Sequence, residues 1–532
     1  MPCPPDRADS CPGQPEPLGR RLLLLGTPVL LAALGSNPWL APEVFDNALY
    51  LEAGRSLAEG RGYTFNGIPV TDWPPGFPLL LALARLLGLP GVLGGRLVVL
   101  TSMLGALLLL ERLLRREGHS APALVAGLTG LLPTSFLAAT RLLAEWPFLL
   151  GLSTSLLLLG SLRSEDRGWW IRGALAGLAV AATTLLRYPG IVLLAVPAAE
   201  VLGALRRPRP STTLLRRLRA PLLSCAAAAL ALAPWLLWLH RARAAGPPAG
   251  TYQGLLSLAV EDLAKADDGL PPVVAALADR GEDLLDTLSE VLVQAENLED
   301  ASGLDDGLLP WLLMVPGGLL LTGFLVRLLG RNRQPGDLFA GATLGLLLLS
   351  GWIRERYWFP ILPWILAGAF QLPGLASRLR PAAGRACQRY LLPALLAVGL
   401  GAAAGNTDLL LRGRPHAGYG GLSLLASPTG EAYYQGVWRD LYRHLRWLRE
   451  EGPPGVLAAD SRYLKYAAAL TRRSVRAPEE EEEAQLVLTA DPAWNRSLRE
   501  QGWRLLRQGA SFLLWQRPET GVRLAPQRHA GG

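Results

Sequence analysis

The sequence contains few of the residues from which metal centres, disulfide frameworks and nucleotide sites are usually built. Its 532 residues include only four cysteines and five histidines. They form no Cys-x-x-Cys or His-Glu-x-x-His motif, and no glycine-rich phosphate-binding loop is present. Because none of the cysteines falls in a segment that we place on the outer side of a membrane, we expect no disulfide framework. The cysteines are Cys3, Cys11, Cys225 and Cys387.

Charged residues are also scarce, and lysine is nearly absent. They make up 18% of the sequence, and hydrophobic residues make up 50%, whereas a soluble domain usually carries about a quarter charged residues. Lys265 and Lys465 are the only lysines, so the net charge of +8 comes from arginine. The arginines gather in short connections between apolar runs, which is typical of cytoplasmic loops and not of a nucleic-acid surface. The composition predicts an integral membrane protein whose partner is the lipid bilayer and that binds no nucleic acid.

Eleven apolar runs approach the length of about 20 helical residues that a bilayer requires. The first run follows Arg20-Arg21 and has no small-residue cleavage site after it, which indicates an uncleaved helix. The two runs within 121–162 are closely spaced, and so are the two within 171–205, so either pair could instead be one longer helix. A single helix at either place would reverse the predicted orientation of every later segment. The runs lie near 22–40, 92–111, 121–140, 146–162, 171–186, 189–205, 220–239, 308–326, 337–353, 358–374 and 390–404.

The arginines predict the orientation of these runs. Five arginine-rich connections share one side if the N-terminal tail, 1–21, is cytoplasmic. A first loop at 41–91, an acidic loop at 240–307 and a C-terminal region from 405 to 532 are then extracytoplasmic. We therefore expect a multi-pass protein of the inner (plasma) membrane. The connections are 112–116, 163–172, 206–219, 327–333 and 378–389.

The C-terminal region has the pattern of a folded domain and not of membrane spans. Its segment 436–451 places apolar residues at positions 437, 441, 445 and 448, on one face of an amphipathic helix. Alternating strands and helices of this kind predict a small α/β domain after the helical membrane module. The expected strands are 456–459, 485–489 and 511–516, and the expected helices between them are 461–470 and 493–501.

The segment 45–78 places a carboxylate among aromatic, glycine and proline residues at a membrane boundary, where a charge costs free energy. In a short helix over 43–59, Asp46 shares a face with Tyr50 and Gly54. A partly desolvated Asp46 is suited to accept a proton from a hydroxyl group. From residue type alone, a helix cap or an interfacial charge is the simpler interpretation. The prolines at 74, 75 and 78 argue against an ordinary helix there.

This loop resembles the first extracytoplasmic loop of the GT-C glycosyltransferases, most closely the relatives of protein O-mannosyltransferases and aminoarabinose transferases (glycosyltransferase family 39-like). The residues that carry the resemblance are Phe45-Asp46, Tyr50, Ala53, Leu57, Gly60, Gly62-Tyr63 and Pro74-Pro75-Gly76-Phe77-Pro78. The resemblance implies a GT-C-like membrane module over 22–404, with Asp46 as the catalytic base. It also implies inverting transfer of a sugar from a polyprenyl-phosphate donor to an acceptor hydroxyl at the extracytoplasmic face.

Further acids and arginines match landmarks of the same family. Glu145 occupies the short outer turn between the third and fourth runs, where a salt bridge to Arg141 is the alternative interpretation. Asp46 and Glu145 are candidate ligands for Mg²⁺ or Mn²⁺, although two acids do not establish a metal site. Arg187 and the turn Arg354-Glu355-Arg356-Tyr357 also fall outside. An arginine there suits a lipid phosphate, with Arg356 the first choice and interfacial snorkelling the alternative.

Tyr63, Asp72 and Trp73 are expected to shape the loop or an acceptor groove. Some relatives have lysine where this chain has Trp73, which argues against the aminoarabinose branch. Two other kinds of protein remain alternatives: a flippase or transporter for lipid-linked sugars, and a silent scaffold for the C-terminal domain. Against transport, the sequence shows no internal repeat, and its charges lie at span ends instead of midspan.

Overall fold

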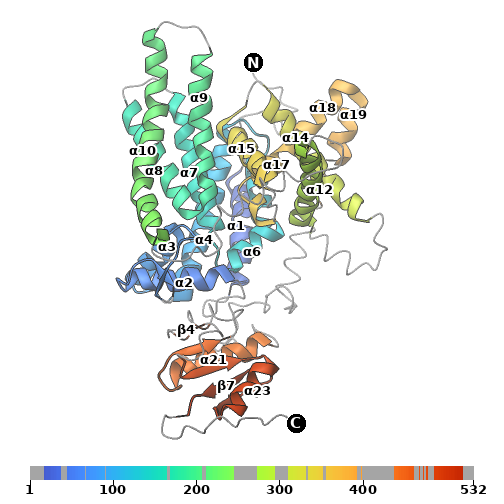
Figure 1. Ribbon diagram of the computed structural model, residues 1–532. Coiled ribbons are helices and arrows are strands. Elements are labelled where there is room, and N and C mark those ends of the chain that lie inside the picture. The colour runs from blue at the N-terminus through green and yellow to red at the C-terminus, as the bar shows by residue number, and fades with distance from the viewer. Residues whose placement is uncertain are drawn as a thin grey trace.

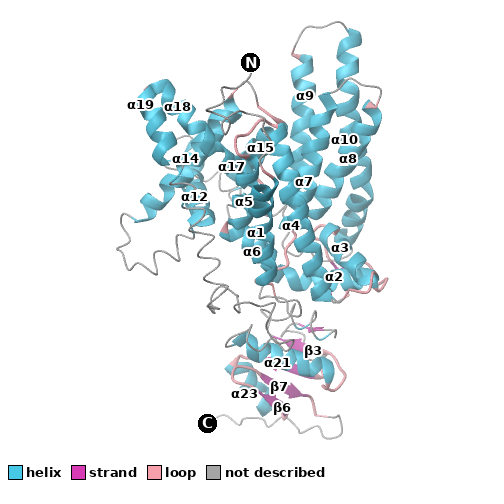
Figure 2. Ribbon diagram, turned by 180° about the vertical axis from the view of Figure 1, so that it is seen from behind, coloured by secondary structure: helices cyan, strands magenta, loops and turns pink. Residues whose placement is uncertain are grey.

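The structure is a computed structural model, and most of the residues that it describes are helical (Figure 1). Helices form one large part of the molecule, and a smaller strand-containing part lies beyond one end of it (Figures 1 and 2). The described residues are 17–36, 45–65, 67–89, 91–163, 168–206, 211–244, 272–293, 309–330, 333–350, 355–391, 393, 397, 437–459, 467, 471, 475–476 and 484–518.

Long apolar helices dominate the large part. Among the described residues, four helical segments are long and apolar enough to cross a membrane, or five if one bent pair counts as a span. The four are Gly91–Arg116, Trp169–Leu186, Tyr188–Leu205 and Leu214–Arg243. The main helices are α1 (Leu18–Leu34), α2 (Phe45–Ala58), α3 (Gly76–Leu86), α4 (Gly91–Arg116), α5 (Pro122–Leu131), α6 (Pro133–Thr140), α7 (Glu145–Gly160), α8 (Trp169–Leu186), α9 (Ala195–Leu205), α10 (Ser211–Ala244), α12 (Pro272–Val293), α14 (Leu309–Leu329) and α15 (Pro335–Ser350).

Two of the predicted runs are not single straight helices, and proline explains both. The run 121–140 divides into α5 and α6, which meet at a bend of 71° where α6 begins with Pro133. The run 358–374 is broken by Pro360, Pro363 and Pro373 into short pieces. These pieces are α16 (Glu355–Trp358), α17 (Leu362–Gly368), the turn η4 (Ala369–Gln371) and α18 (Leu372–Leu379), followed by α19 (Pro381–Ala386) and η5 (Cys387–Leu391). The run 390–404 lies almost wholly outside the described residues.

Two helices occupy segments that the sequence had suggested were loops. The prolines near 75 do not prevent α3, because Pro75 caps the helix and Pro78 lies in its first turn, where proline is tolerated. Helix α12 lies within the acidic segment 240–307. Its Leu284, Leu288 and Leu292 are buried at a spacing of four residues. The spacing that identifies α12 was therefore present in the sequence.

Two of the arginine-rich connections, 112–116 and 327–333, lie together at one end of the helical part. The Arg116 side chain, at the end of α4, donates a hydrogen bond to the carbonyl of Leu157 in the last turn of α7 (3.1 Å). Arg327, at the end of α14, donates to the carbonyl of Glu117 just after α4 (2.9 Å). Glu145 begins α7 at its other end. One end of this part is therefore rich in arginine, and the Glu145 end is distinct from it.

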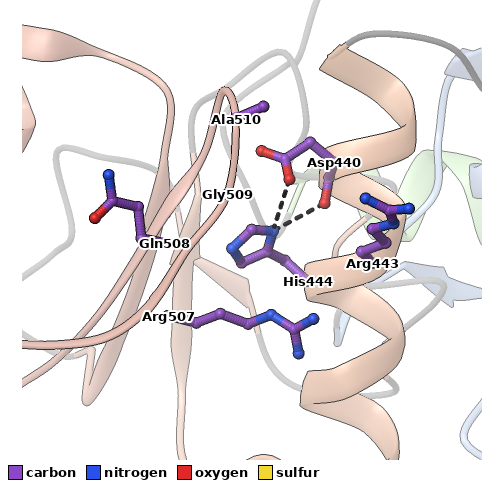
Figure 3. Close-up of a pocket in the computed structure, with 7 residues that line it drawn as sticks. All are labelled: Asp440, Arg443, His444, Arg507, Gln508, Gly509 and Ala510. Atoms are coloured by element: carbon purple, nitrogen blue, oxygen red, sulfur yellow. Dashed lines mark hydrogen bonds and ion pairs between the residues drawn. The ribbon is translucent and has the colours of Figure 1, made fainter.

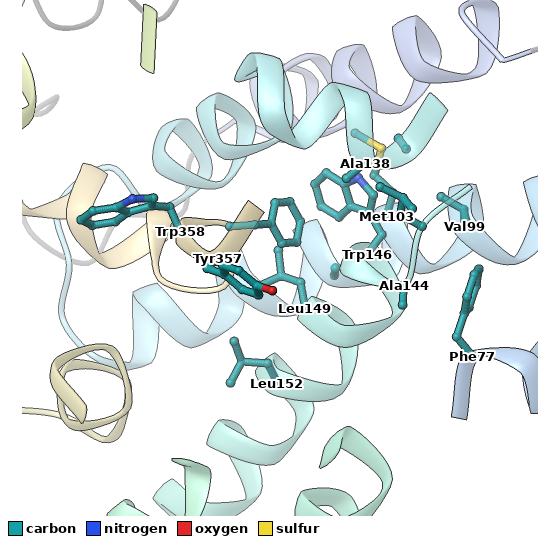
Figure 4. Close-up of a cluster of buried hydrophobic side chains, with 14 of the residues drawn as sticks. Phe77, Val99, Met103, Ala138, Ala144, Trp146, Leu149, Leu152, Tyr357 and Trp358 are labelled. Atoms are coloured by element: carbon teal, nitrogen blue, oxygen red, sulfur yellow. The ribbon is translucent and has the colours of Figure 1, made fainter. Parts of the chain in front are cut away.

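A continuous hydrophobic core lies behind Glu145. Trp146 is fully buried, and its ring meets that of Phe359 edge to face, with 5.1 Å between the centroids. Figure 4 shows Trp146 with Met103 and Ala138 on one side, and Tyr357 close to Leu149 and Leu152 on the other. Three chain segments far apart in sequence are thus fixed against one another.

The smaller part contains a mixed five-stranded sheet in the order β4-β3-β5-β7-β6. Strands β3, β4 and β5 are parallel, whereas β7 runs antiparallel to β5 and β6. Helix α21 covers the sheet with its buried Leu441, Leu445 and Leu448. The elements are α21 (Val437–Glu450), β3 (Leu457–Ala459), β4 (Val475–Arg476), β5 (Leu486–Thr489), α23 (Pro492–Glu500), β6 (Arg504–Gln508) and β7 (Leu513–Gln516). Most of the expected helix 461–470 lies outside the described residues.

Candidate active site

Helix α2 lies across the end of the helical part that is nearer to the sheet (Figures 1 and 2). Its buried residues include Ala48, Leu49 and Ala53, while Asp46 occupies its first turn. A carboxylate in the first turn of a helix is stabilised by the helix dipole. Tyr50, one turn later, packs edge to face against Phe77 of α3, with 5.1 Å between the centroids. The helix thus holds Asp46 at the edge of the apolar core.

Asp46 forms an ion pair with Arg356 of α16, with 2.5 Å between Oδ2 and Nη1. The Asp46 side chain is 9% exposed, and that of Arg356 is 34% exposed. Burial opposes the charge on Arg356, but the carboxylates of Asp46 and Glu145 outweigh it and raise the pKa of the guanidinium above its ordinary value. Arg356 therefore remains a cation that is bound by Asp46 and attracted by the nearby charge of Glu145.

Glu145 forms a second ion pair, with Arg187, at 2.5 Å between Oε1 and Nη1. Glu145 lies in the first turn of α7, and Arg187 is the extended residue that follows α8. Both side chains are nearly buried, at 4% and 11% exposure. The alternative interpretation from the sequence, a Glu145–Arg141 salt bridge, is wrong, because Arg187 takes that place. The backbone carbonyl of Arg141 instead accepts a hydrogen bond from Asn47 (3.3 Å).

Two tyrosines join these ion pairs into one site. The Tyr357 ring centroid lies 5.8 Å from the guanidinium carbon of Arg187 and 5.5 Å from that of Arg356. Burial raises the pKa of Tyr50 well above its ordinary value, and the nearby carboxylates of Asp46 and Glu145 add to the effect. We call the six residues the carboxylate–arginine cluster: Asp46, Glu145, Arg187, Arg356, Tyr50 and Tyr357.

A glycine allows the segments of the cluster to approach. Gly76 begins α3, and a Cβ atom there would lie only 2.5 Å from the carbonyl oxygen of Leu185 in the last turn of α8. Leu185 precedes Arg187 by two residues, so this contact fixes the turn from which Arg187 extends. Only glycine permits such a close approach of two backbones.

Asp72 and Trp73 are not among the residues of the carboxylate–arginine cluster. The carbonyl of Trp73 accepts a hydrogen bond from the Tyr63 hydroxyl (3.0 Å). Burial raises the pKa of Tyr63 well above the ordinary value, and its neighbours Tyr188 and Asp72 add to the effect. Arg354 lies outside the described residues.

The Tyr63 region also contains residues that the sequence reasoning missed. The rings of Trp235 and Trp238, near the end of α10, stack at 4.8 Å between centroids. Their spacing of three residues at the end of an apolar run was the signal available in the sequence.

The acids of the carboxylate–arginine cluster suit a divalent cation poorly. Each carboxylate is already bound by a guanidinium, so the two positive charges balance the two negative charges. Within the described part of the chain, no group of three or more histidine, cysteine, aspartate or glutamate residues is arranged to hold a metal ion. Mg²⁺ and Mn²⁺ prefer about six oxygen ligands.

The chain is similar in fold to ArnT, a GT-C glycosyltransferase, and this likeness confirms the predicted fold type but not the number of membrane spans. It is similar to ArnT from Cupriavidus metallidurans bound to undecaprenyl phosphate, with a TM-score of 0.54 and 14% sequence identity over 93% of this chain and 98% of ArnT. The structure of ArnT in the apo state has the same sequence identity to this chain, 14%, and a TM-score of 0.55. The match covers 93% of this chain and 97% of ArnT.

The archaeal oligosaccharyltransferase AglB from Archaeoglobus fulgidus is less similar, with a TM-score of 0.47 and 15% identity over 88% of this chain and 69% of AglB. No protein-family model and no curated protein sequence matches the chain.

Proposed function

We propose that this protein is a membrane glycosyltransferase that transfers a sugar from a polyprenyl-phosphate donor to an acceptor hydroxyl, with inversion at the anomeric carbon. One observation carries the proposal: two carboxylates and two arginines from four separate segments meet at one end of a GT-C helical bundle. ArnT, which has a similar fold, binds undecaprenyl phosphate in one of its structures. That likeness supports a polyprenyl phosphate as the lipid of the donor.

The carboxylate–arginine cluster contains the groups that a single displacement needs. Asp46 takes the proton of the acceptor hydroxyl while that oxygen attacks the anomeric carbon. The bond between the anomeric carbon and the phosphate oxygen breaks, and the products are a glycosylated acceptor and a polyprenyl phosphate. Arg356, with Arg187, stabilises the negative charge of the departing phosphate.

The Asp46–Arg356 ion pair suggests an order for these events. A donor phosphate competes with Asp46 for the Arg356 guanidinium, because both are oxyanions. Once the phosphate holds Arg356, the carboxylate of Asp46 is released from this hydrogen bond and can accept one from the acceptor hydroxyl instead. Donor binding thereby prepares the base for the acceptor.

We also propose the orientation that the arginine pattern predicts. The arginine-rich end of the bundle is cytoplasmic, and the carboxylate–arginine cluster faces the extracytoplasmic side. In both views the sheet part lies toward the α2 end of the bundle (Figures 1 and 2), which agrees with an extracytoplasmic C-terminal domain.

The test is sugar transfer by the purified full-length protein in liposomes, with a panel of labelled polyprenyl-phosphate sugars. The wild type should release polyprenyl phosphate from one donor, and Asp46→Asn should lose that activity, by about a hundredfold or more. Glu52→Gln is the matched control, because Glu52 is a buried, ion-paired acid on the same helix, bonded to Arg55 at 2.6 Å. It should keep its turnover per folded molecule.

Equal turnover in Asp46→Asn and wild type would exclude Asp46 as the base. If no donor is turned over while labelled lipid crosses the bilayer, the flippase alternative would replace the enzyme.

A further inference from the structure

Beside the carboxylate–arginine cluster lies a second group of side chains to which the proposed mechanism assigns no role. The stacked indoles of Trp235 and Trp238 are inclined to each other by 19°, and Tyr63 packs against both, at 5.7 Å and 5.9 Å between centroids. Trp235 and Trp238 are each only partly buried, whereas Tyr63 is 7% exposed. We call these three rings, together with Tyr188, the aromatic platform.

The aromatic platform is not an ordinary lipid-facing belt of interfacial aromatics. Leu236 and Leu237, which lie between the two tryptophans, are 54% and 59% exposed and form the outer face of α10. Trp235 and Trp238 instead turn toward Tyr63 in the loop after α2. Belt residues anchor a helix by facing the headgroups, so the inward direction of these indoles indicates another role.

Polar groups border the aromatic platform. Tyr188 has Arg243, Trp235 and Asp72 as polar neighbours. Arg243 also donates a long hydrogen bond to the carbonyl of Thr71 (3.4 Å). An isoprenoid chain packed here would lie against a carboxylate and a guanidinium that it cannot hydrogen-bond. Flat aromatic faces bordered by a few charged hydrogen-bonding groups instead match a sugar ring, which has apolar C–H faces and hydroxyl edges.

The aromatic platform adjoins the carboxylate–arginine cluster through two consecutive residues. Arg187 is extended (φ −153°, ψ 136°) and contacts Glu145, and Tyr188 follows it in the chain. Tyr188 begins the short 3-10 helix η3 (Tyr188–Leu194), and its neighbours include Tyr63 and Trp235 of the platform. One short segment therefore places its arginine in the carboxylate–arginine cluster and its tyrosine on the platform.

From this arrangement we infer that Trp235, Trp238 and Tyr188 form a sugar-ring subsite, with Asp72 and Arg243 as hydrogen-bonding partners of the sugar hydroxyls. The inference rests on the proposed glycosyl transfer and specifies where that reaction holds a sugar. The ring belongs either to the donor or to a saccharide acceptor, and both have the same recognition chemistry.

Binding is tested apart from turnover, by saturation-transfer-difference NMR of methyl hexopyranosides with the full-length protein in detergent micelles. The wild type should saturate the ring C–H protons of at least one glycoside, and Trp235→Leu and Trp238→Leu should lose most of that signal. The matched control is Trp169→Leu, because Trp169 is a partly buried indole stacked on Arg219 (4.6 Å) at the first turn of α8, the end opposite Arg187. This control should keep the signal.

The kinetic measurement distinguishes the two sources of the ring. Release of polyprenyl phosphate to water without acceptor depends on the donor alone, so a donor subsite predicts that the donor KM rises about tenfold in the two variants. An acceptor subsite predicts an unchanged donor KM and loss of transfer to added glycoside. If a flat ring is sufficient, Trp235→Phe and Trp238→Phe should keep most of the donor affinity or glycoside transfer that the leucine variants lose.

The subsite would be disproved if no glycoside gives a signal with wild type, or if Trp169→Leu loses as much as the platform variants. Unchanged kinetics for both donor and glycoside in folded platform variants would disprove it equally. If glycosides bind at the platform but no donor is turned over by wild type, the subsite stands and the proposed transferase function fails.

Discussion

At the scale of single residues, Asp46 and Arg356 are 310 positions apart in the chain and yet share a hydrogen bond. Burying one charged side chain costs free energy unless a side chain of opposite charge is buried with it. A substitution that removes one partner therefore leaves the charge of the other uncompensated. Glu145 and Arg187 repeat the arrangement, so the carboxylate–arginine cluster has no net formal charge. Each buried charge of the cluster is therefore compensated by a partner of opposite sign.

Replacement of Arg356 by lysine should lower kcat/KM for donor turnover by about 10²–10³-fold, because lysine keeps the charge but not the planar pair of donors that fits a phosphate. Arg187→Lys should cost less, since Arg187 is held by Glu145. Both are measured by release of polyprenyl phosphate in liposomes. Arg85→Lys provides the control, since Arg85 forms an exposed pair with Glu59 at 3.2 Å and is expected to leave the rate unchanged. Wild-type kinetics in Arg356→Lys would remove Arg356 from the phosphate site.

At the scale of elements, local signals in the sequence identified some helices and missed others. The three- and four-residue spacing at Asp46, Tyr50 and Gly54 predicted a helix, and α2 is present there. The prolines around Pro75 were interpreted as breaking a helix, but they start α3. The spacing of Leu284 and Leu288 also favours a helix, but the acidic residues around them are typical of a solvated loop.

The pairing of elements could not be predicted from the sequence by physical reasoning. Nothing local joins Glu145 to Arg187, and the nearer Arg141 is the better candidate by distance along the chain. The tertiary packing of α7 against α8 determines the partner. The family resemblance selected Asp46, Glu145, Arg187 and Arg356 as site residues, but the structure alone shows which acid meets which arginine. The aromatic platform was missed because its rings converge from the loop after α2 and from α10.

The close approach of α3 to α8 gives a prediction about a single methyl group. Gly76→Ala should lower the free energy of unfolding by about 1–3 kcal/mol and reduce turnover, because the new Cβ displaces the backbone before Arg187. Thermal unfolding in detergent and donor turnover measure the two effects. The control is Gly91→Ala at the start of α4, where an added Cβ meets nothing within 4 Å. Gly76→Ala with wild-type stability and rate would show that the contact is not needed.

At the scale of the whole molecule, the sheet part contains buried titratable side chains of its own, Asp440 and His444. The sheet part contains a pocket of about 440 Å³, lined among others by Asp440, Arg443, His444 and Arg507 (Figure 3). The Asp440 carboxylate accepts hydrogen bonds from the backbone of Ser511 (2.7 Å) and of the following residue, which ties α21 to the start of β7. The sheet part can therefore respond to pH through groups in this pocket.

His444 predicts the direction of that response. Burial lowers the pKa of its imidazole, and the positive charge of Arg507 adds to the effect, while hydrogen bonds to the backbone and the Asp440 carboxylate oppose it. Nδ1 lies 2.8 Å from the Asp440 carbonyl oxygen, and Arg443 lines the same pocket. The folded state therefore takes up this proton at a lower pH than the unfolded state, whose histidine titrates near about 6.5. The contribution of His444 to the free energy of unfolding is complete above the pKa of the unfolded state. It is lost as the pH falls toward the lowered pKa of the folded state.

Hydrogen exchange followed by mass spectrometry on the full-length protein measures this loss in α21 and β6. Wild type should lose protection between pH 7.5 and pH 5.5 relative to His444→Asn at the same pH, since asparagine can replace the Nδ1 hydrogen bond but cannot take up a proton. Comparison at equal pH cancels the intrinsic pH dependence of exchange. His240→Asn, which changes an exposed histidine in α10, should respond as wild type does. An identical pH response in wild type and His444→Asn would show that another group controls the acid stability of the sheet part.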